Sequence, residues 1–215
     1  MINNKINILK GKFKKFKIDG YIVPKNDEYF SEYAKNDRLK NISNFSGSAG
    51  FAVILKKKNY LFIDGRYTIQ AKQESGKNFS IIEIHKKLPN VIIKNCNLGY
   101  DPRLFTSKSI RNYFSNNKLI PIDENLIDQI FVFKEKTTKP FYSLSKNIVG
   151  ETHQSKISKV VNFIKSNKAD YLFTSAPENV AWLLNIRGYD NPNSPIPNSR
   201  LIIDKNKKIY LITQK

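Results

Sequence analysis

The chain has 215 residues, of which 40% are hydrophobic, and it carries one cysteine and a formal net charge of +19. This length allows one large core or two modest ones. The first ten residues lack the apolar core of a signal peptide, and no apolar run approaches the roughly 20 residues of a membrane span. We therefore expect a cytoplasmic protein with no membrane partner. The single Cys96 cannot form an internal disulfide, and no Cys or His lies near it at zinc-ligand spacing.

The positive charge is the compositional feature that could attract an anionic partner such as nucleic acid. Only six of the 37 basic residues are arginine, the residue that nucleic-acid-binding proteins use for bidentate contacts. The lysines are spread along the chain, and no basic stripe is interleaved with aromatic residues. The sequence therefore predicts no nucleic-acid partner.

Hydrophobic spacing predicts alternating helices and strands over the first 134 residues. Apolar residues at helical spacing predict a helix over 3–18 that stops at Gly20. Two apolar runs, 51–55 and 60–64, are separated by a lysine-rich turn and predict a β-hairpin. The remaining predictions are strands at 21–24, 79–84, 91–93, 98–101 and 119–122, and helices at 67–75, 107–114 and 125–131. These elements indicate an α/β fold.

A shortened second copy of this pattern follows a predicted linker at 135–150, where periodicity is lost and Pro140 and Gly150 occur. At an offset of about 150 residues, a helix, a strand and a hairpin recur, which is the signature of a duplication. Their predicted positions are 156–167 for the helix, 171–173 for the strand, and 201–204 with 210–213 for the hairpin. The first copy continues well beyond its hairpin, whereas the second stops at Lys215. We therefore predict a domain at 1–134 and an incomplete one at 151–215.

Two polar stretches could carry chemistry but favour structural roles. Asp27, Glu28 and Glu32 could bind a cation, yet no His or further carboxylate lies at ligand spacing, so a loop with a helix N-cap at Asp27 or Ser31 is favoured. The small residues of 45–50 could form a phosphate loop or a nucleophile elbow, but both require a following helix. A strand follows here, which favours a tight turn with a closely packed backbone.

Asp64-Gly65-Arg66-Tyr67 lies where a predicted strand meets a predicted helix. Asp64 suits an N-cap and Gly65 a turn, but a cation such as Arg66 opposes the helix dipole in this position. Arg66 is therefore either held by a carboxylate or kept for an incoming anionic or carbonyl group, and the residues alone leave both open. No set of catalytic or metal-ligating residues can be assembled elsewhere, so we expect no catalytic centre in this chain.

Six motifs in one order resemble Xaa-Pro aminopeptidase (aminopeptidase P) in its long, three-domain form, over essentially the whole chain. They are Ser31-Glu32-Tyr33, Asp37-Arg38, the loop at 45–50, Asp64-Gly65-Arg66-Tyr67 with Gln70-Ala71, Gly99-Tyr100-Asp101-Pro102, and the stretch from Ala181 to Gly188. The resemblance implies two tandem creatinase N-terminal-like domains, each a mixed sheet flanked by helices, the second one incomplete. It also implies that Arg66 contacts the substrate.

In that family a C-terminal pita-bread domain supplies two Asp, one His and two Glu ligands to a pair of manganese-type divalent ions, and no residue here corresponds to them. The resemblance thus implies a non-catalytic region, inactive alone, that serves substrate binding and oligomerisation. Its implied partners are a peptide with proline at the second position and, in the full-length protein, a second copy forming a homodimer. The alternative is a stand-alone binding or scaffold protein with the same fold and a basic surface for an acidic partner.

Overall fold

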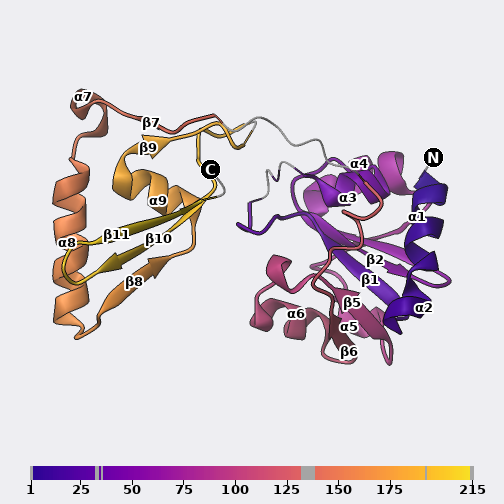
Figure 1. The fold of residues 1–215 in the computed structure, drawn as a ribbon. Coiled ribbons are helices and arrows are strands. Elements are labelled where there is room, and N and C mark those ends of the chain that lie inside the picture. Colours follow the sequence, from indigo (N-terminus) through magenta and orange to yellow (C-terminus); the bar gives the residue numbers. More distant parts are fainter. Residues whose placement is uncertain (1, 32–33, 35, 132–138, 192, 214–215) are drawn as a thin grey trace. The chain divides into compact units, whose positions relative to one another are not determined.

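The computed structural model describes residues 2–31, 34, 36–131, 139–191 and 193–213. The chain divides into two compact units, residues 1–134 (unit 1) and 135–215 (unit 2), which are drawn in Figure 1. Within the described residues, no helix has the length and apolar content needed to cross a bilayer.

Unit 1 is built on a six-stranded mixed sheet in the order β4-β3-β2-β1-β5-β6. Only β2 runs antiparallel to its neighbours, so the other five strands share one direction. The strands are β1 (Gly20–Pro24), β2 (Gly50–Leu55), β3 (Asn59–Ile63), β4 (Ser80–Glu83), β5 (Asn97–Tyr100) and β6 (Lys118–Pro121). The hairpin of β2 and β3 confirms the predicted one.

Helices cover both faces of this sheet, because the apolar residues of its central strands alternate between two cores. Tyr21 and Val23 of β1 join one core with residues of α1, α3 and α4, whereas Ile22 joins the other with residues of α6 (Figure 1). The helices are α1 (Ile2–Gly11), α2 (Phe13–Phe16), α3 (Arg38–Ser43), α4 (Thr68–Ser75), α5 (Pro89–Ile92) and α6 (Ser107–Phe114), with 3-10 turns η1 (Gly65–Tyr67) and η2 (Pro102–Leu104). This arrangement is the expected mixed sheet flanked by helices.

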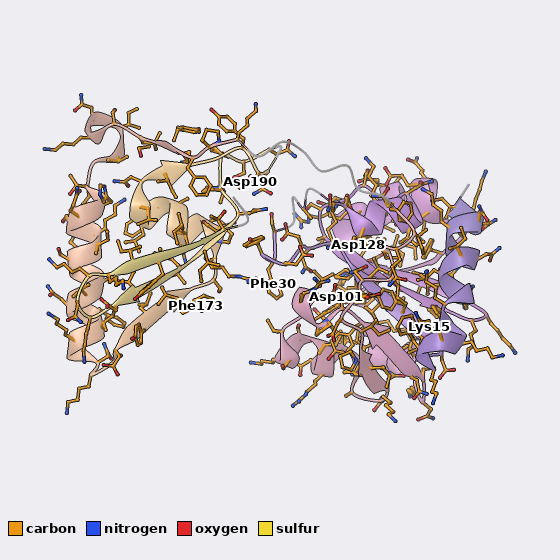
Figure 2. All side chains as sticks on the ribbon, viewed as in Figure 1. Lys15, Phe30, Asp101, Asp128, Phe173 and Asp190 are labelled. Atoms are coloured by element: carbon orange, nitrogen blue, oxygen red, sulfur yellow. The ribbon has the colours of Figure 1, made fainter. Side chains whose placement is uncertain are left out.

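Carboxylates recur at one end of the parallel strands of unit 1, and lysines recur at the other end. A carboxylate ends or follows each of the five parallel strands: Asp27, Asp64, Glu83, Asp101 and Asp123. A lysine precedes or begins each of the same strands: Lys17, Lys58, Lys77, Lys94 and Lys118. Figure 2 labels Lys15 of α2, Asp101 and Asp128 among the side chains of this unit. These lysines are far apart in the sequence, but they lie together at the amino ends of the strands because the strands are parallel.

Unit 2 holds a three-stranded sheet in the order β11-β10-β8. Leu172, Leu201 and Ile203 pack against two helices, α8 and α9, on one face of it. On the opposite face, Phe173 is 58% exposed and Tyr210 is 42% exposed. The elements are β7 (Tyr142–Ser143), α7 (Lys146–Val149), α8 (His153–Ser166), β8 (Tyr171–Thr174), α9 (Pro177–Leu184), β9 (Ile186–Arg187), β10 (Ser199–Asp204) and β11 (Ile209–Thr213).

Matching contacts in the two units support the duplication. Asp19 precedes β1 and forms an ion pair with Lys56, just as Asp170 precedes β8 and forms one with Lys205. The helix before each of these strands is followed by a lysine with positive φ, Lys17 or Lys168. The antiparallel trio β8, β10 and β11 therefore corresponds to β1, β2 and β3, and the described residues of unit 2 hold no counterpart of β4 to β6.

Three predicted elements differ from the structure. Residues 89–92 form the short helix α5, where a strand was predicted at 91–93, because Pro89 has a φ suited to the first helical position. Residues 125–131 form turns and no helix, and the Asn125 side chain accepts a hydrogen bond from the Ile127 N–H at 2.9 Å. No helix covers 27–31, where Phe30 has a φ of 60°.

Part of the predicted linker at 135–150 is regular structure. Its residues 135–138 lie outside the described residues. The strand β7 pairs antiparallel with β9 of unit 2, and the helix α7 follows it. The two strands β7 and β9 lie more than 40 residues apart in sequence. The local pattern at 139–150 therefore contains no sign of this pairing.

Lys156 of α8 holds the end of α9 in unit 2. The Lys156 side chain is buried and donates hydrogen bonds to the Trp182 carbonyl at 2.8 Å and to Asn185 Oδ1 at 2.7 Å. We expect Lys156→Met to lower the free energy of unfolding of unit 2 by about 2–3 kcal/mol, because both acceptors lose their partner in a buried place. Trp182 is the only tryptophan of the chain, so its fluorescence in a urea titration reports this transition.

The control for this prediction is Lys159→Met on the same helix, where the lysine is 72% exposed and pairs with Glu151 at 2.8 Å. A surface ion pair of this kind contributes about 0–1 kcal/mol. Equal shifts of the Trp182 transition in the two variants would contradict the role of Lys156.

Candidate functional site

Arg66 lies at the carboxyl end of the parallel strands, in the 3-10 turn η1 that joins β3 to α4. Asp64 is the N-cap of this turn, and its Oδ1 accepts the Arg66 backbone N–H at 2.9 Å. The N-cap predicted for Asp64 is therefore present. The backbone at Arg66 is held in place because it follows the buried strand β3 directly and lies in the turn capped by Asp64.

The Arg66 side chain folds back onto the same carboxylate. Its Nε donates to Asp64 Oδ1 at 2.9 Å, and its Nη2 lies 3.4 Å from Asp64 Oδ2. These hydrogen bonds lower the pKa of the Asp64 carboxyl below its ordinary value. The Arg66 side chain is nevertheless 71% exposed. A carboxylate holds Arg66, and the guanidinium remains accessible from solvent.

Gly65 lies close to the exposed side chain of His85, the second residue after β4. A Cβ at this position would lie 2.8 Å from Cε1 of His85, which follows β4. His85 Nε2 lies 3.4 Å from Glu83 Oε2, and a hydrogen bond from Lys86 lowers the pKa of the Glu83 carboxyl. The turn carrying Arg66 is therefore flanked by a second polar group at the end of β4.

Tyr67 connects Arg66 with the loop at 45–50. The Arg66 guanidinium lies 5.5 Å from the centre of the Tyr67 ring, and the Tyr67 hydroxyl hydrogen-bonds Ser48 Oγ at 2.8 Å. The Tyr67 ring also packs edge to face against the buried Phe45 ring. The two ring centres lie 5.8 Å apart, and the ring planes are inclined at 79°. A Cβ on Gly47 would lie 2.3 Å from Phe45 Cζ, so this loop is the closely packed turn that the sequence predicts.

The same loop is tied to α4 by Glu74. Its carboxylate accepts hydrogen bonds from the Ser46 backbone N–H at 2.8 Å and from the Ser46 hydroxyl at 2.7 Å. Burial raises the pKa of Glu74, but the hydrogen bonds from Ser46 and Gln70 together with the charge of Lys40 outweigh it, so the net pKa is lowered. The backbone around Arg66 is thus braced on the sheet, on the loop and on the helix, as a preorganised site requires.

A buried ion network at the same end of the sheet was not predicted. Arg38, the first residue of α3, has a side chain only 5% exposed and binds Asp128 through Nε at 2.7 Å and Nη2 at 2.8 Å. Its Nη2 also donates to Glu28 at 2.8 Å. Burial alone would lower the pKa of Arg38, but the hydrogen bonds to the two carboxylates raise it. Arg38 and Asp128 lie 90 residues apart in sequence, so no local motif could reveal this pair.

The described residues do not gather a metal centre. No group of three or more His, Cys, Asp or Glu side chains among them could hold a metal ion. Several carboxylates at this end of the sheet are engaged instead: Asp128 accepts from Arg38, Asp64 from Arg66, Asp101 from Arg103, and Asp27 from a backbone N–H. Carboxylates engaged in this way do not fit a dinuclear metal site.

Two models of known protein families match the chain. A family model described as the creatinase/prolidase N-terminal domain matches residues 5–130, and a second model with the same description matches residues 134–215. The chain belongs to the creatinase/prolidase N-terminal domain family. Two tandem creatinase N-terminal domains are thereby confirmed, as the sequence motifs indicated.

The relatives of these creatinase domains are Xaa-Pro aminopeptidases. The chain is 32% identical to "Xaa-Pro aminopeptidase 2" of Rattus norvegicus, with 94% of the chain and 33% of that protein covered. It is 28% identical to a "Probable Xaa-Pro aminopeptidase P" of Coprinopsis cinerea, with 96% and 36% covered. The chain therefore spans about a third of the length of these relatives, and it corresponds to their N-terminal part.

A solved structure shares the fold. The X-prolyl aminopeptidase from Caenorhabditis elegans, described as a cytosolic enzyme with a di-nuclear active site, matches with a TM-score of 0.85 at 23% identity. The match covers 100% of the chain and 39% of that structure. At this identity the likeness shows the fold of the creatinase domains.

Proposed function

We propose that this chain is the non-catalytic N-terminal region of a metal-dependent Xaa-Pro aminopeptidase, in which Arg66 contacts the peptide substrate. The observation that carries the proposal is Arg66 itself, held in the Asp-Gly-Arg-Tyr turn of a chain related over its whole length to these enzymes. In this proposal residues 1–134 are the first domain and residues 151–215 belong to the second, with 135–150 between them.

The geometry around Arg66 supports a binding role. A guanidinium has five N–H donors and suits a carboxylate or a peptide carbonyl. Asp64 orients it through Nε and Nη2, and the exposed side chain lies at the carboxyl end of the parallel strands, where ligands of α/β sheets are usually bound. The substrate in the proposal is a peptide with proline at the second position.

The proposal assigns the metal chemistry to a part of the enzyme other than the residues described. Two manganese-type divalent ions, bound there, would supply Lewis-acid chemistry. The full-length protein is in this proposal a cytoplasmic homodimer, to whose assembly the chain contributes. Support for these statements comes from the family resemblance and from the cytosolic, di-nuclear enzyme of Caenorhabditis elegans.

The test joins the chain to the catalytic domain of its own gene and measures hydrolysis of an Xaa-Pro peptide with manganese. We expect Arg66→Ala to lower kcat/KM by about 10–100-fold, because a hydrogen bond to a charged group contributes about 1.5–3 kcal/mol. Arg66→Lys should recover part of the loss. Arg111→Ala, a change of an exposed arginine of α6, is the matched control and should leave kcat/KM within about twofold.

Three results would refute separate parts of the proposal. Turnover by the 215-residue chain alone would show that it holds a catalytic centre. An active joined enzyme whose kcat/KM is unchanged by Arg66→Ala would remove Arg66 from the substrate site. Sedimentation of the joined enzyme as a monomer would refute the homodimer.

A further inference from the structure

The amino end of the unit 1 sheet carries a row of cations with one lysine at each parallel strand. We define the lysine row as Lys17, Lys58, Lys77, Lys94 and Lys118. All five side chains are exposed, and none forms an ion pair within the part of the chain that the structure describes. The Asp19 carboxylate in this region is already engaged by Lys56 at 2.6 Å and by the Asn97 N–H at 2.9 Å.

Hydrogen bonds along the sheet edge hold the row together. Strand ends in a sheet lie about 4.8 Å apart, so six strands place the row over about 24 Å. Each of the five pairs of neighbouring strand ends is linked by a hydrogen bond. The bonds are Asn59 Nδ2 to the Asn78 carbonyl at 3.0 Å, Leu55 N to the Lys58 carbonyl at 2.9 Å, Lys56 N to the Asp19 carbonyl at 3.1 Å, Asp19 N to the Asn97 carbonyl at 2.7 Å, and Lys118 N to the Cys96 carbonyl at 3.0 Å. The row is therefore a fixed feature of the fold, although its side chains are flexible.

We propose that the lysine row binds an acidic α-helical segment of a protein partner laid across the sheet edge. Side chains four residues apart on a helix lie about 5–6 Å from one another, which is close to the ~4.8 Å spacing of the strands. A helix of about 16 residues rises ~24 Å, the length of the row. A helix of this length with a glutamate at every fourth residue would carry about four carboxylates along the five lysines of the row.

Local aromatic contacts disfavour nucleic acid as the occupant. Bases bound without sequence preference stack on exposed aromatic faces. The two rings beside the row, Phe16 and Tyr60, are already covered by Lys15 at 5.3 Å and by Lys58 at 5.1 Å from their centres. No arginine directly flanks any of the five lysines in the sequence, and arginine is the residue that forms bidentate phosphate contacts.

The test measures binding of a fluorescein-labelled, helix-forming peptide of about 16 residues with glutamates every fourth position. Fluorescence anisotropy with the full chain gives its Kd. We expect replacement of all five row lysines by glutamine to raise Kd at least about tenfold, since each exposed contact contributes a few tenths of a kcal/mol. Raising salt should weaken binding to the unaltered chain as well.

The matched control replaces five exposed lysines outside the row by glutamine: Lys40, Lys72, Lys87, Lys108 and Lys165. It removes the same charge and should change Kd less than about twofold. An equal rise in Kd in both quintuple variants would show that the peptide binds through the overall positive charge of the chain, and it would overturn the proposal. So would equal binding of an isomeric peptide with its glutamates spread around the helix. Tighter binding of oligothymidylate through the same lysines would assign the row to phosphate backbones instead.

Discussion

Replacing Arg38 by methionine is expected to lower the free energy of unfolding of unit 1 by about 2–4 kcal/mol. The guanidinium is buried and joins α3 to Asp128, which is 90 residues away in sequence, and to Glu28, which is 10 residues away. Methionine keeps much of the side-chain volume but donates no hydrogen bond. The two carboxylates are 35% and 33% exposed and can regain water, which keeps the loss below that of a fully buried pair.

Trp182 makes this prediction specific to one unit. Circular dichroism in a urea titration reports both units, whereas tryptophan fluorescence reports unit 2, which holds the only tryptophan. We expect Arg38→Met to move the circular dichroism transition while the Trp182 transition stays in place. Arg111→Met, on an exposed position of α6, should move neither by more than about 0.5 kcal/mol. An unchanged circular dichroism midpoint in Arg38→Met would show that the network contributes no net stability.

Local patterns predict the elements that depend on local physics. The hairpin of β2 and β3 combines two apolar runs with a polar turn, and its partners are close in sequence. The N-cap at Asp64 and the packed turn at Gly47 follow from side-chain oxygen chemistry and from the absence of a Cβ. The duplication is visible because the same sequence of elements returns at a fixed offset.

Long-range contacts explain most of what the sequence did not reveal. Arg38 pairs with Asp128 across 90 residues, and β7 pairs with β9 from segments that show little periodicity. The lysine row exists only because parallel strands bring their starts to one edge, a fact that requires the strand directions. The sequence identified Arg66, but its contact with Tyr67 and the bond of Tyr67 to Ser48 required the structure.

A methyl group at Gly47 is expected to lower the free energy of unfolding of unit 1 by about 2 kcal/mol through overpacking. The new Cβ would lie 2.3 Å from Phe45 Cζ and 3.0 Å from Tyr67 Cδ1. Phe45 is fully buried and cannot move aside without disturbing the core, so the strain passes to the loop and to the Tyr67 ring. Urea unfolding of Gly47→Ala followed by circular dichroism measures the loss.

Gly11→Ala is the matched control, because a Cβ on this last residue of α1 meets no atom within 4 Å. Alanine is favoured over glycine in a helix, and we expect this variant to be neutral or stabilised by up to about 1 kcal/mol. Equal destabilisation in both variants would contradict the close packing at Gly47. In the joined enzyme, displacement of Tyr67 by Gly47→Ala should also lower kcat/KM for an Xaa-Pro peptide, whereas Gly11→Ala should leave it unchanged. This pair of variants therefore separates the stability of unit 1 from the positioning of Arg66.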